Sequence, residues 1–313
     1  MHPHLAPQAG TEIGIIRQPR PRRRFIRALY HQHRAYGQAI GLERACHGII
    51  ADMGGDPTVV RYAPFIDEYL EIGKRLKDRI TDVSREINIA LIEEKNVLAE
   101  GAQGAFLDVI HGTQKFVTSS FTTAGSACAN LGVGPVMVDN AVGVIKAYIT
   151  RVGEGPMPTE LKDDLGVRMR EKGGEYGTTT GRARRCGWFD AVLGLKSVYL
   201  NGYTELALTK LDVLTGIDPI KICIGYDLDG EKLGYPPEAT EDLARCQPIY
   251  EEMTGWTEDI TEIKEYDDLP ANARAYVERL DDLLYVEPLD NCIAAVSVGP
   301  GREQTIYLDE PED

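Results

Sequence analysis

The stretch Leu206-Ala207-Leu208-Thr209-Lys210-Leu211-Asp212 decides the fold class of this 313-residue chain. Its first residues are apolar and charges follow at once, which is the pattern of a buried strand that ends in a polar loop. Two more apolar runs, Ile220–Gly225 and Cys292–Val298, also read as strands, and the second ends in Gly299-Pro300-Gly301. A fourth predicted strand, Asn96–Glu100, leads directly into a glycine-rich turn.

Helical patterns separate these strands. Pro64–Glu94 places apolar residues near a 3.6-residue period, and Ala271–Leu284 reads as an amphipathic helix. Val136–Tyr148 reads as a helix that turns into a strand. Strands alternating with helices predict an α/β fold with a mainly parallel central sheet and helices on both faces. Ligands of such sheets bind at the carboxyl ends of the strands.

The composition excludes several classes of protein. With 43% hydrophobic residues the chain can bury a large core, but its longest apolar runs are far too short for a membrane span. The beginning of the chain does not read as a signal peptide, so we expect a cytoplasmic location and no membrane partner. Six cysteines without a C-x-x-C pair predict buried thiols, and packing is favoured over reactivity even for Cys186, which follows an arginine run.

The net charge of −15 is unevenly distributed. Residues 1–47 hold eight arginines and two acidic residues, a local charge of +6, so the remainder carries −21. An acidic body argues against nucleic acid as a partner. The first segment, 1–47, is either a disordered basic arm or sequence read in a shifted frame, with a nucleic-acid-binding arm as a third alternative. We therefore expect an α/β domain over 48–313, preceded by an atypical basic segment.

The segment Gly177–Trp188 has the composition of an anion cradle. Its first residues combine three threonines, two glycines and three arginines. Glycines let backbone N–H groups approach a ligand, and arginine forks hold carboxylate or phosphate groups through two hydrogen bonds. The alternative is a solvated basic turn.

Three other segments at strand ends are candidates for nucleotide binding. After a strand, Lys-x-Asp can read guanine, because the Asp212 carboxylate accepts from two donors that adenine lacks; a plain surface pair is the alternative. The turn Ser297–Gly301 can wrap a base with backbone groups or be no more than a turn. Gln103 can contact a purine or a phosphate, or be a polar loop residue.

Two patterns expected of a nucleotide-dependent enzyme do not occur. The sequence contains no G-x-x-x-x-G-K-[ST] phosphate loop, and His111 is the only histidine beyond 1–47. No catalytic residue and no metal ligand is therefore identified in this chain.

Several motifs occur together in one order over about 96–307: Glu100–Gly104, His111–Thr113, Val117–Ser120, Gly132–Pro135, Thr150–Glu160, Glu175–Trp188, Leu208–Leu214 and Ser297–Ile306. In this order they resemble the adenylosuccinate synthetase family, and a fainter match reaches back to about Cys46. The resemblance implies that family's P-loop-NTPase-like α/β fold, truncated at its amino end.

The resemblance also implies a reaction. The family is a GTP-dependent ligase of purine nucleotide biosynthesis, which forms a C–N bond between IMP and L-aspartate. GTP phosphorylates the 6-oxygen of IMP, and the amine of aspartate then displaces phosphate to give adenylosuccinate. The family uses one Mg²⁺ ion, whose ligands the resemblance places outside this chain, and it is commonly a homodimer.

Site residues are carried over by their positions in the motifs. The resemblance assigns IMP contacts to Gln103, Thr118 and Arg182. It assigns the aspartate-binding loop to Thr178, Thr179, Thr180, Gly181, Arg182 and Arg184. It assigns GTP contacts to Arg184, Lys210, Leu211, Asp212, Ser297, Val298 and Gly299.

The chain also departs from the family's pattern. The family's glycine-rich loop, with its Asp base, and its catalytic His segment have no counterpart here, and Ala183, Val298 and Gly301 replace common residues. The chain is expected to be an adenylosuccinate synthetase that lacks catalytic machinery. The alternative is a non-catalytic remnant that binds GTP and IMP or dimerises. If neighbouring strands are lacking, an edge or a face of the sheet should be bare.

Overall fold

The computed structural model describes residues 44–59, 63–177 and 181–308, and it divides into two compact units, 1–82 and 83–313. Of the basic segment predicted at 1–47, only residues 44–47 are among those described, and they lie in a helix that ends at residue 52. The alternatives for this segment therefore stay predictions.

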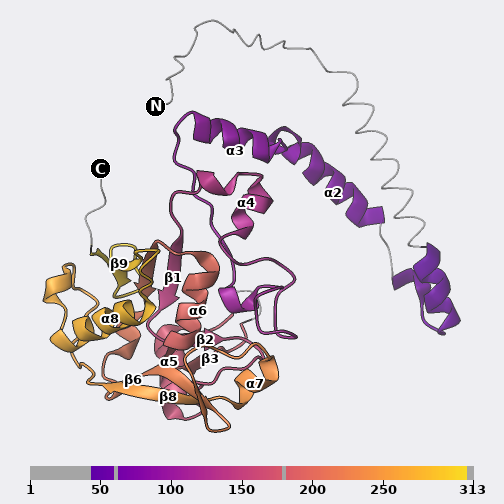
Figure 1. Cartoon of the computed structure of the whole chain (residues 1–313). Coiled ribbons are helices and arrows are strands. Elements are labelled where there is room, and N and C mark those ends of the chain that lie inside the picture. Colours follow the sequence, from indigo (N-terminus) through magenta and orange to yellow (C-terminus); the bar gives the residue numbers. More distant parts are fainter. Residues whose placement is uncertain (1–43, 60–62, 178–180, 309–313) are drawn as a thin grey trace, which may run out of the picture. The chain divides into compact units, whose positions relative to one another are not determined.

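The first unit consists of helices. After the helix at 44–52 come the 3-10 helix η1 (Pro57–Val59), the helix α2 (Ala63–Leu76) and the 3-10 helix η2 (Lys77–Arg79) (Figure 1). None of its residues with a described side chain is fully buried. The prediction of one continuous helix over Pro64–Glu94 is wrong, because the helical stretch is interrupted. Ile80 adopts an extended backbone conformation (ψ 116°), and a second helix, α3 (Val83–Ile92), begins in the other unit.

A four-stranded sheet lies at the centre of the second unit, in the order β1-β5-β9-β10. The strands β1 (Val142–Lys146), β5 (Glu205–Thr209) and β9 (Cys292–Ser297) are parallel, and β10 (Thr305–Tyr307) is antiparallel to β9. The mainly parallel α/β sheet predicted from the sequence is confirmed. Two of its predicted strands lie within a residue of β5 and β9.

The predicted strand Asn96–Glu100 does not form. This segment has no regular secondary structure, and Leu98 is 92% exposed. A strand is stable only when its backbone groups find a partner, and β1 is the edge of the central sheet in the part of the chain that the structure describes. The apolar pattern of the segment is therefore not enough to order it.

A second sheet surrounds β6 (Ile220–Leu228). β6 pairs in parallel with β4 (Phe189–Asp190) and antiparallel with β7 (Glu231–Leu233) and β8 (Gln247–Met253). The strand predicted at Ile220–Gly225 therefore exists but belongs to this sheet and not to the central one. A short third sheet joins β2 (Ile149–Arg151) to β3 (Arg185–Gly187).

Helices connect and cover the strands. They are α4 (Ser126–Leu131), α5 (Asp164–Gly173), α6 (Ala191–Asn201), α7 (Thr240–Arg245) and α8 (Ala271–Leu284), with the 3-10 helices η3 (Ala105–Leu107), η4 (Pro135–Met137), η5 (Leu211–Leu214) and η6 (Tyr266–Asp268). Aspartates cap two of them: Asp163 accepts from Gly166 N at 3.2 Å and Asp190 from Leu193 N at 3.1 Å. No helix of the described residues is both long and apolar enough to cross a membrane.

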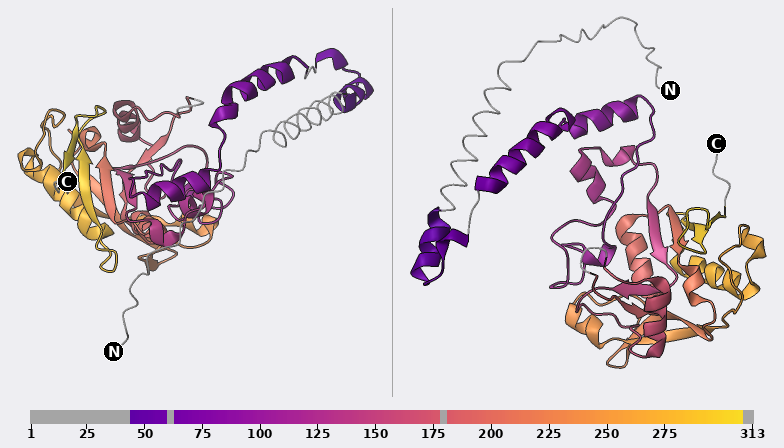
Figure 2. Two further views of the ribbon diagram at one scale, coloured as in Figure 1. Left: turned by 90° about the horizontal axis from the view of Figure 1, so that it is seen from above. Right: turned by 180° about the vertical axis from the view of Figure 1, so that it is seen from behind.

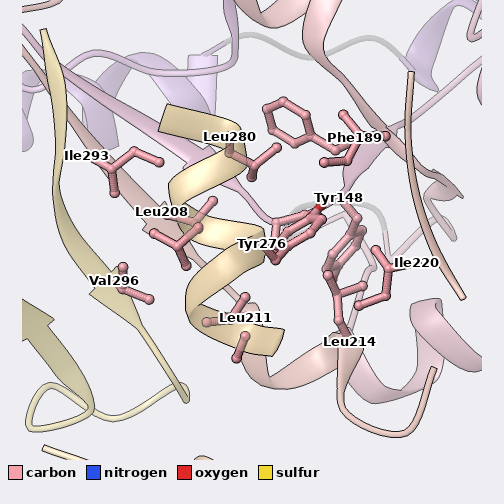
Figure 3. Close-up of a cluster of buried hydrophobic side chains, with 14 of the residues drawn as sticks. Tyr148, Phe189, Leu208, Leu211, Leu214, Ile220, Tyr276, Leu280, Ile293 and Val296 are labelled. Carbon is pink, nitrogen blue, oxygen red and sulfur yellow. The ribbon is translucent and has the colours of Figure 1, made fainter. Parts of the chain in front are cut away.

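The main core lies on one side of the central sheet. Leu208 and Val296 face Leu280 and Tyr276 of α8, which lies along these strands (Figures 2 and 3). The hydroxyl of Tyr276 donates to the carbonyl of Ala147 at 2.7 Å, so its polar atom is satisfied inside the core. Each fully buried aliphatic side chain here contributes about 1.5–3 kcal/mol relative to exposure.

The other side of β1 is open. Val142 and Val144 project to it and are 54% and 73% exposed. Such alternating exposed valines are unusual in the edge strand of a folded domain. This agrees with the expectation of a bare edge or face.

Candidate functional site

Two of the predicted nucleotide-binding segments meet at one edge of the central sheet. Lys210 follows the end of β5, and Ser297 is the last residue of β9. Because β5 and β9 are parallel neighbours, with Leu208 opposite Val296, the segments after them emerge side by side. The structure therefore brings Lys210–Asp212 together with Ser297–Gly299.

Lys210 has an unusual backbone conformation. Its φ of 62° lies in the left-handed region, which non-glycine residues rarely occupy and which is common at functional sites. It directly precedes the 3-10 helix η5, whose first residue, Leu211, is fully buried. Leu211 belongs to the main core, so it anchors η5 there.

Asp212 lies half-buried on the same short helix. Burial raises the pKa of its carboxyl group, and the nearby charge of Lys172 opposes this shift. An ionised carboxylate in this position can accept two hydrogen bonds from a planar donor pair such as that of guanine.

The turn after β9 is built around Gln304, which sequence reasoning missed. Val298 N donates to the carbonyl of Gln304 at 2.8 Å, and Gly301 N donates to its side-chain oxygen at 2.8 Å. A Cβ at Gly299 would lie 2.5 Å from the Gln304 side chain, and one at Gly301 2.8 Å from it. A side chain at either position would therefore displace the amide end of Gln304 from its place in the turn. Val298 is fully buried and, like Leu211, belongs to the main core.

One fully buried carboxylate, Glu175, lies beside these strand ends. Lys146, at the end of β1, donates to both of its oxygens at 2.8 Å. Tyr148 donates to it at 2.7 Å and Arg184 at 2.9 Å. The ammonium group of Lys210 is 3.7 Å away and also donates to the carbonyl of Gly173.

The protonation of this cluster follows from its contacts. Burial acts to raise the pKa of Glu175, but the hydrogen bonds from Lys146 and Tyr148, with the surrounding positive charges, outweigh it and hold the pKa below its usual value. Glu175 is therefore ionised, and three cations surround a single anion. The sequence did not single out Glu175 or Lys146. The signal in the sequence was an acidic residue two positions before Gly177, where the arginine-rich loop (177–185) begins.

The predicted anion cradle is a closed loop. Gly177 N donates to the carbonyl of Arg182 at 2.8 Å, and Gly181 N donates to that of Gly177 at 2.7 Å. Gly181 has a φ of 64°, which favours glycine. The backbone N–H of Arg184 donates to the carbonyl of Glu175 at 2.9 Å, which fixes the base of the loop. Thr178, Thr179 and Thr180, predicted to bind aspartate, lie outside the described residues.

Two of the three predicted IMP contacts, Gln103 and Thr118, lie in a second group of loops, whereas the third, Arg182, belongs to the arginine-rich loop. Thr118 N donates to the carbonyl of Leu107 at 2.7 Å, and Thr122 Oγ1 donates to that of Gly104 at 2.9 Å. These bonds place Thr118 in the same group of loops as Gln103, which is exposed and has a φ of 64°.

Asp108 organises this second group of loops from inside. Its buried carboxylate accepts from the backbone N–H groups of Ile110 at 2.9 Å, His111 at 3.0 Å and Thr122 at 2.6 Å. Burial acts to raise the pKa of Asp108, but these hydrogen bonds lower it below its usual value. Asp108 thus has a structural role that the sequence analysis did not recognise.

Arg151 lies between this second group of loops and the arginine-rich loop. Its Nη2 donates to Thr113 Oγ1 at 2.6 Å and to the carbonyl of Phe116 at 2.8 Å. On its other side it pairs across β2 and β3 with Arg185, next to Arg184. Gly155 leaves room for it, because a Cβ there would collide with the Arg151 guanidinium.

The prediction of buried thiols is confirmed for Cys186, Cys223 and Cys246. It is wrong for Cys46, Cys128 and Cys292, which are half-buried. All six are free thiols, and burial raises the pKa of Cys186 to about 11, so its reactive thiolate is rare at neutral pH. Among the residues that the structure describes, no group of three or more His, Cys, Asp or Glu side chains could hold a metal ion.

Comparison with known proteins gives a consistent result. The family model of adenylosuccinate synthetase matches residues 12–306, a range that includes most of the atypical basic segment. Adenylosuccinate synthetase of Methanothrix thermoacetophila is 74% identical over 260 residues, which is 83% of this chain and 61% of that protein. The enzyme of Methanosarcina barkeri is 62% identical over 82% of this chain and 59% of its own length.

A solved structure agrees in fold. The fully ligated adenylosuccinate synthetase of Plasmodium falciparum has a TM-score of 0.76 and 39% identity, over 81% of this chain and 60% of that one. The chain thus spans about three fifths of the length of the relatives it matches. The matched family model, the sequence identity and the shared fold together establish that this chain belongs to the adenylosuccinate synthetase family.

Proposed function

We propose that the protein to which this chain belongs ligates IMP and L-aspartate at the expense of GTP, as an adenylosuccinate synthase of purine nucleotide biosynthesis. The observation that carries the proposal is the meeting of Lys210–Asp212, Ser297–Gly299 and the arginine-rich loop at one edge of the parallel sheet. That edge combines a carboxylate acceptor with an excess of positive charge. A guanine nucleotide needs both.

The GTP site has a division of roles. Asp212 accepts from the edge of guanine, and the stem of Lys210 packs along the base. We assign Leu211, Val298 and Gly299, which are buried, and the partly exposed Ser297 to the walls of the same site. In the structure that hydroxyl donates to the carbonyl of Gly299 at 2.8 Å, which holds the turn in shape.

The arginine-rich loop carries the second substrate. We assign the carboxylates of aspartate to Gly181, Arg182, Arg184 and the threonines at 178–180, with Arg184 also reaching GTP and Arg182 also reaching IMP. The closed base of the loop, from Gly177 to Arg182, supports this assignment. Gln103 and Thr118 are proposed to contact IMP from the neighbouring loops.

The chemistry proposed for the whole protein has two steps. GTP phosphorylates the 6-oxygen of IMP, and the amine of aspartate then displaces phosphate at the same carbon. Arg182 and Arg184 would stabilise the charge that develops on the transferred and departing groups. The described residues offer no cluster that fits the Mg²⁺ ion of the family, so no step is assigned to it here. The homodimer and the cytoplasmic location stay predictions.

An alternative from another functional class is a non-catalytic protein that binds GTP and IMP. What favours it is that the sequence of this chain contains no G-x-x-x-x-G-K-[ST] phosphate loop. Incubation of the purified chain with IMP, GTP, aspartate and Mg²⁺, followed by chromatography for adenylosuccinate, tests the first proposal. Calorimetric titration with GTP and with IMP separates the two. Binding without product supports the alternative, and neither binding nor product contradicts both.

A further inference from the structure

The Glu175 carboxylate contacts residues from three separate segments, of which 146–148 supplies both Lys146 and Tyr148. Lys146 comes from the end of β1, Tyr148 from just before β2, Arg184 from the arginine-rich loop and Lys210 from the end of β5. Segments far apart in the sequence are thus held at one point.

Two of these contacts involve proposed ligand-binding residues. Arg184 and Lys210 are about one-third exposed at their side chains, whereas Glu175 is not exposed at all. A substrate can therefore reach the two cations but not the carboxylate behind them. Whatever Glu175 does for a substrate must act through those cations.

Lys210 has a particular need for such support. Its left-handed backbone conformation is unfavourable for a non-glycine residue and persists only if the surroundings hold it. The attraction of Glu175 and the hydrogen bond to the Gly173 carbonyl both bind its ammonium group. These contacts fix where the stem of Lys210 lies.

We propose that Glu175 is a positioning residue that orients Lys210 and Arg184 together for binding of a guanine nucleotide. The inference rests on the proposed function, because it takes Lys210 and Arg184 to be nucleotide contacts. One buried carboxylate sets the placement of both cations. Lys210 in the segment after β5 and Arg184 in the arginine-rich loop are therefore positioned together. Replacing the Glu175 carboxylate by a neutral amide weakens the positioning of both cationic side chains.

The test is calorimetric titration of the full chain with GTP, comparing wild type with Glu175→Gln. Loss of the charge should weaken GTP binding roughly tenfold, since a hydrogen bond to a charged group is worth about that factor. Glu171→Gln is the matched control: Glu171 lies four residues earlier, is exposed, and bonds to Tyr176. We expect its GTP affinity to equal that of wild type.

A double-mutant cycle separates positioning from mere stabilisation. If Glu175 acts through Lys210, the effect of Glu175→Gln on GTP affinity should shrink in a Lys210→Met background. A purely structural role would lower the melting temperature and leave the two effects on affinity additive. If Glu175→Gln does not fold, Arg184→Met and Lys210→Met replace it. Coupled effects of these two support the inference, and additive effects overturn it.

The outcomes separate a failure of the proposed function from a failure of the inference about Glu175. If the wild-type chain binds no GTP, the proposed function is contradicted, and so is the inference about Glu175 that depends on it. If wild type and Glu175→Gln bind GTP equally well, only the inference is overturned. Weaker binding by Glu175→Gln, normal binding by Glu171→Gln and non-additivity with Lys210→Met together support it.

Discussion

Asp190 should make the stability of this protein depend on pH in an unusual direction. Its carboxyl group is almost completely buried, accepts from the hydroxyl of Tyr226 at 2.6 Å and caps α6 through Leu193 N at 3.1 Å. Burial raises its pKa from 3.8 to about 6, although the hydrogen bonds from Tyr226 and the backbone act the other way. The folded state therefore holds this proton more tightly than the unfolded state does.

The magnitude follows from the displacement of the pKa. Below pH 3.8 the group is protonated in both states, and above pH 6 it is ionised in both. Between these values the folded protein binds more protons, so the contribution of Asp190 to the free energy of unfolding falls as the pH rises. The total loss by pH 7 is of order 3 kcal/mol. Most carboxylates in folded proteins act in the opposite direction.

Asp190→Asn isolates this effect. The amide can still accept from Leu193 N and can donate to the Tyr226 oxygen, so the remaining cost of the substitution should not depend on pH. We expect the stability of the variant, measured by urea unfolding and relative to wild type, to increase by about 2 kcal/mol from pH 4 to pH 7. Asp163→Asn is the control, because Asp163 caps α5 in the same way but is exposed. A constant difference between Asp190→Asn and wild type would refute the reasoning.

Three further predictions concern the core, the guanine site and the last turn. Leu208→Ala removes a fully buried side chain and should lower the free energy of unfolding by about 2–5 kcal/mol, measured by urea unfolding. Asp212→Asn should reduce the preference for GTP over ATP roughly tenfold or more in calorimetric titration, since the amide presents a donor where guanine also donates. Gln304→Ala removes the acceptor of Gly301 N and the donor to Thr261, and should weaken GTP binding while ATP binding stays unchanged. Equal losses for both nucleotides would contradict the last two.

The sequence predicted the parts of the fold that depend on local pattern. Ala271–Leu284 is a helix with the predicted bounds, because its apolar period matches one buried face against the sheet. The strand ending at Thr209 is also where the apolar run predicted it. In both segments the residues that carry the pattern are those that enter the core, so pattern and packing agree.

The sequence could not predict which sheet a strand joins. Ile220–Gly225 and Cys292–Val298 have equally apolar patterns, yet the first pairs with β4, β7 and β8 and the second with β5 and β10. Pairing depends on contacts between residues far apart in the chain, and periodicity carries no information about them. Asn96–Glu100 shows the same limit, since its pattern predicts a strand that finds no partner among the described residues.

The residues of the candidate site also differ in whether the sequence could predict them. Lys210, Asp212 and the arginines could be found because glycine, charge and strand ends coincide in the sequence. Glu175, Gln304 and Asp108 could not, because each acts by contacts with distant segments and looks like an ordinary polar residue. The proposed ligand contacts lie in segments that follow strands, whereas Glu175 and Asp108, which hold neighbouring segments in place, are fully buried. A motif therefore identifies what meets a substrate, and a structure is needed to find what keeps it in place.

The exposed side of β1 bears on how this site works. Lys146, which donates to Glu175, is the last residue of β1, and the two valines before it on the same strand project into solvent. Covering that side would remove Val142 and Val144 from water and would also restrict the strand that carries Lys146. The order of the Glu175 cluster is thus tied to the edge of the sheet.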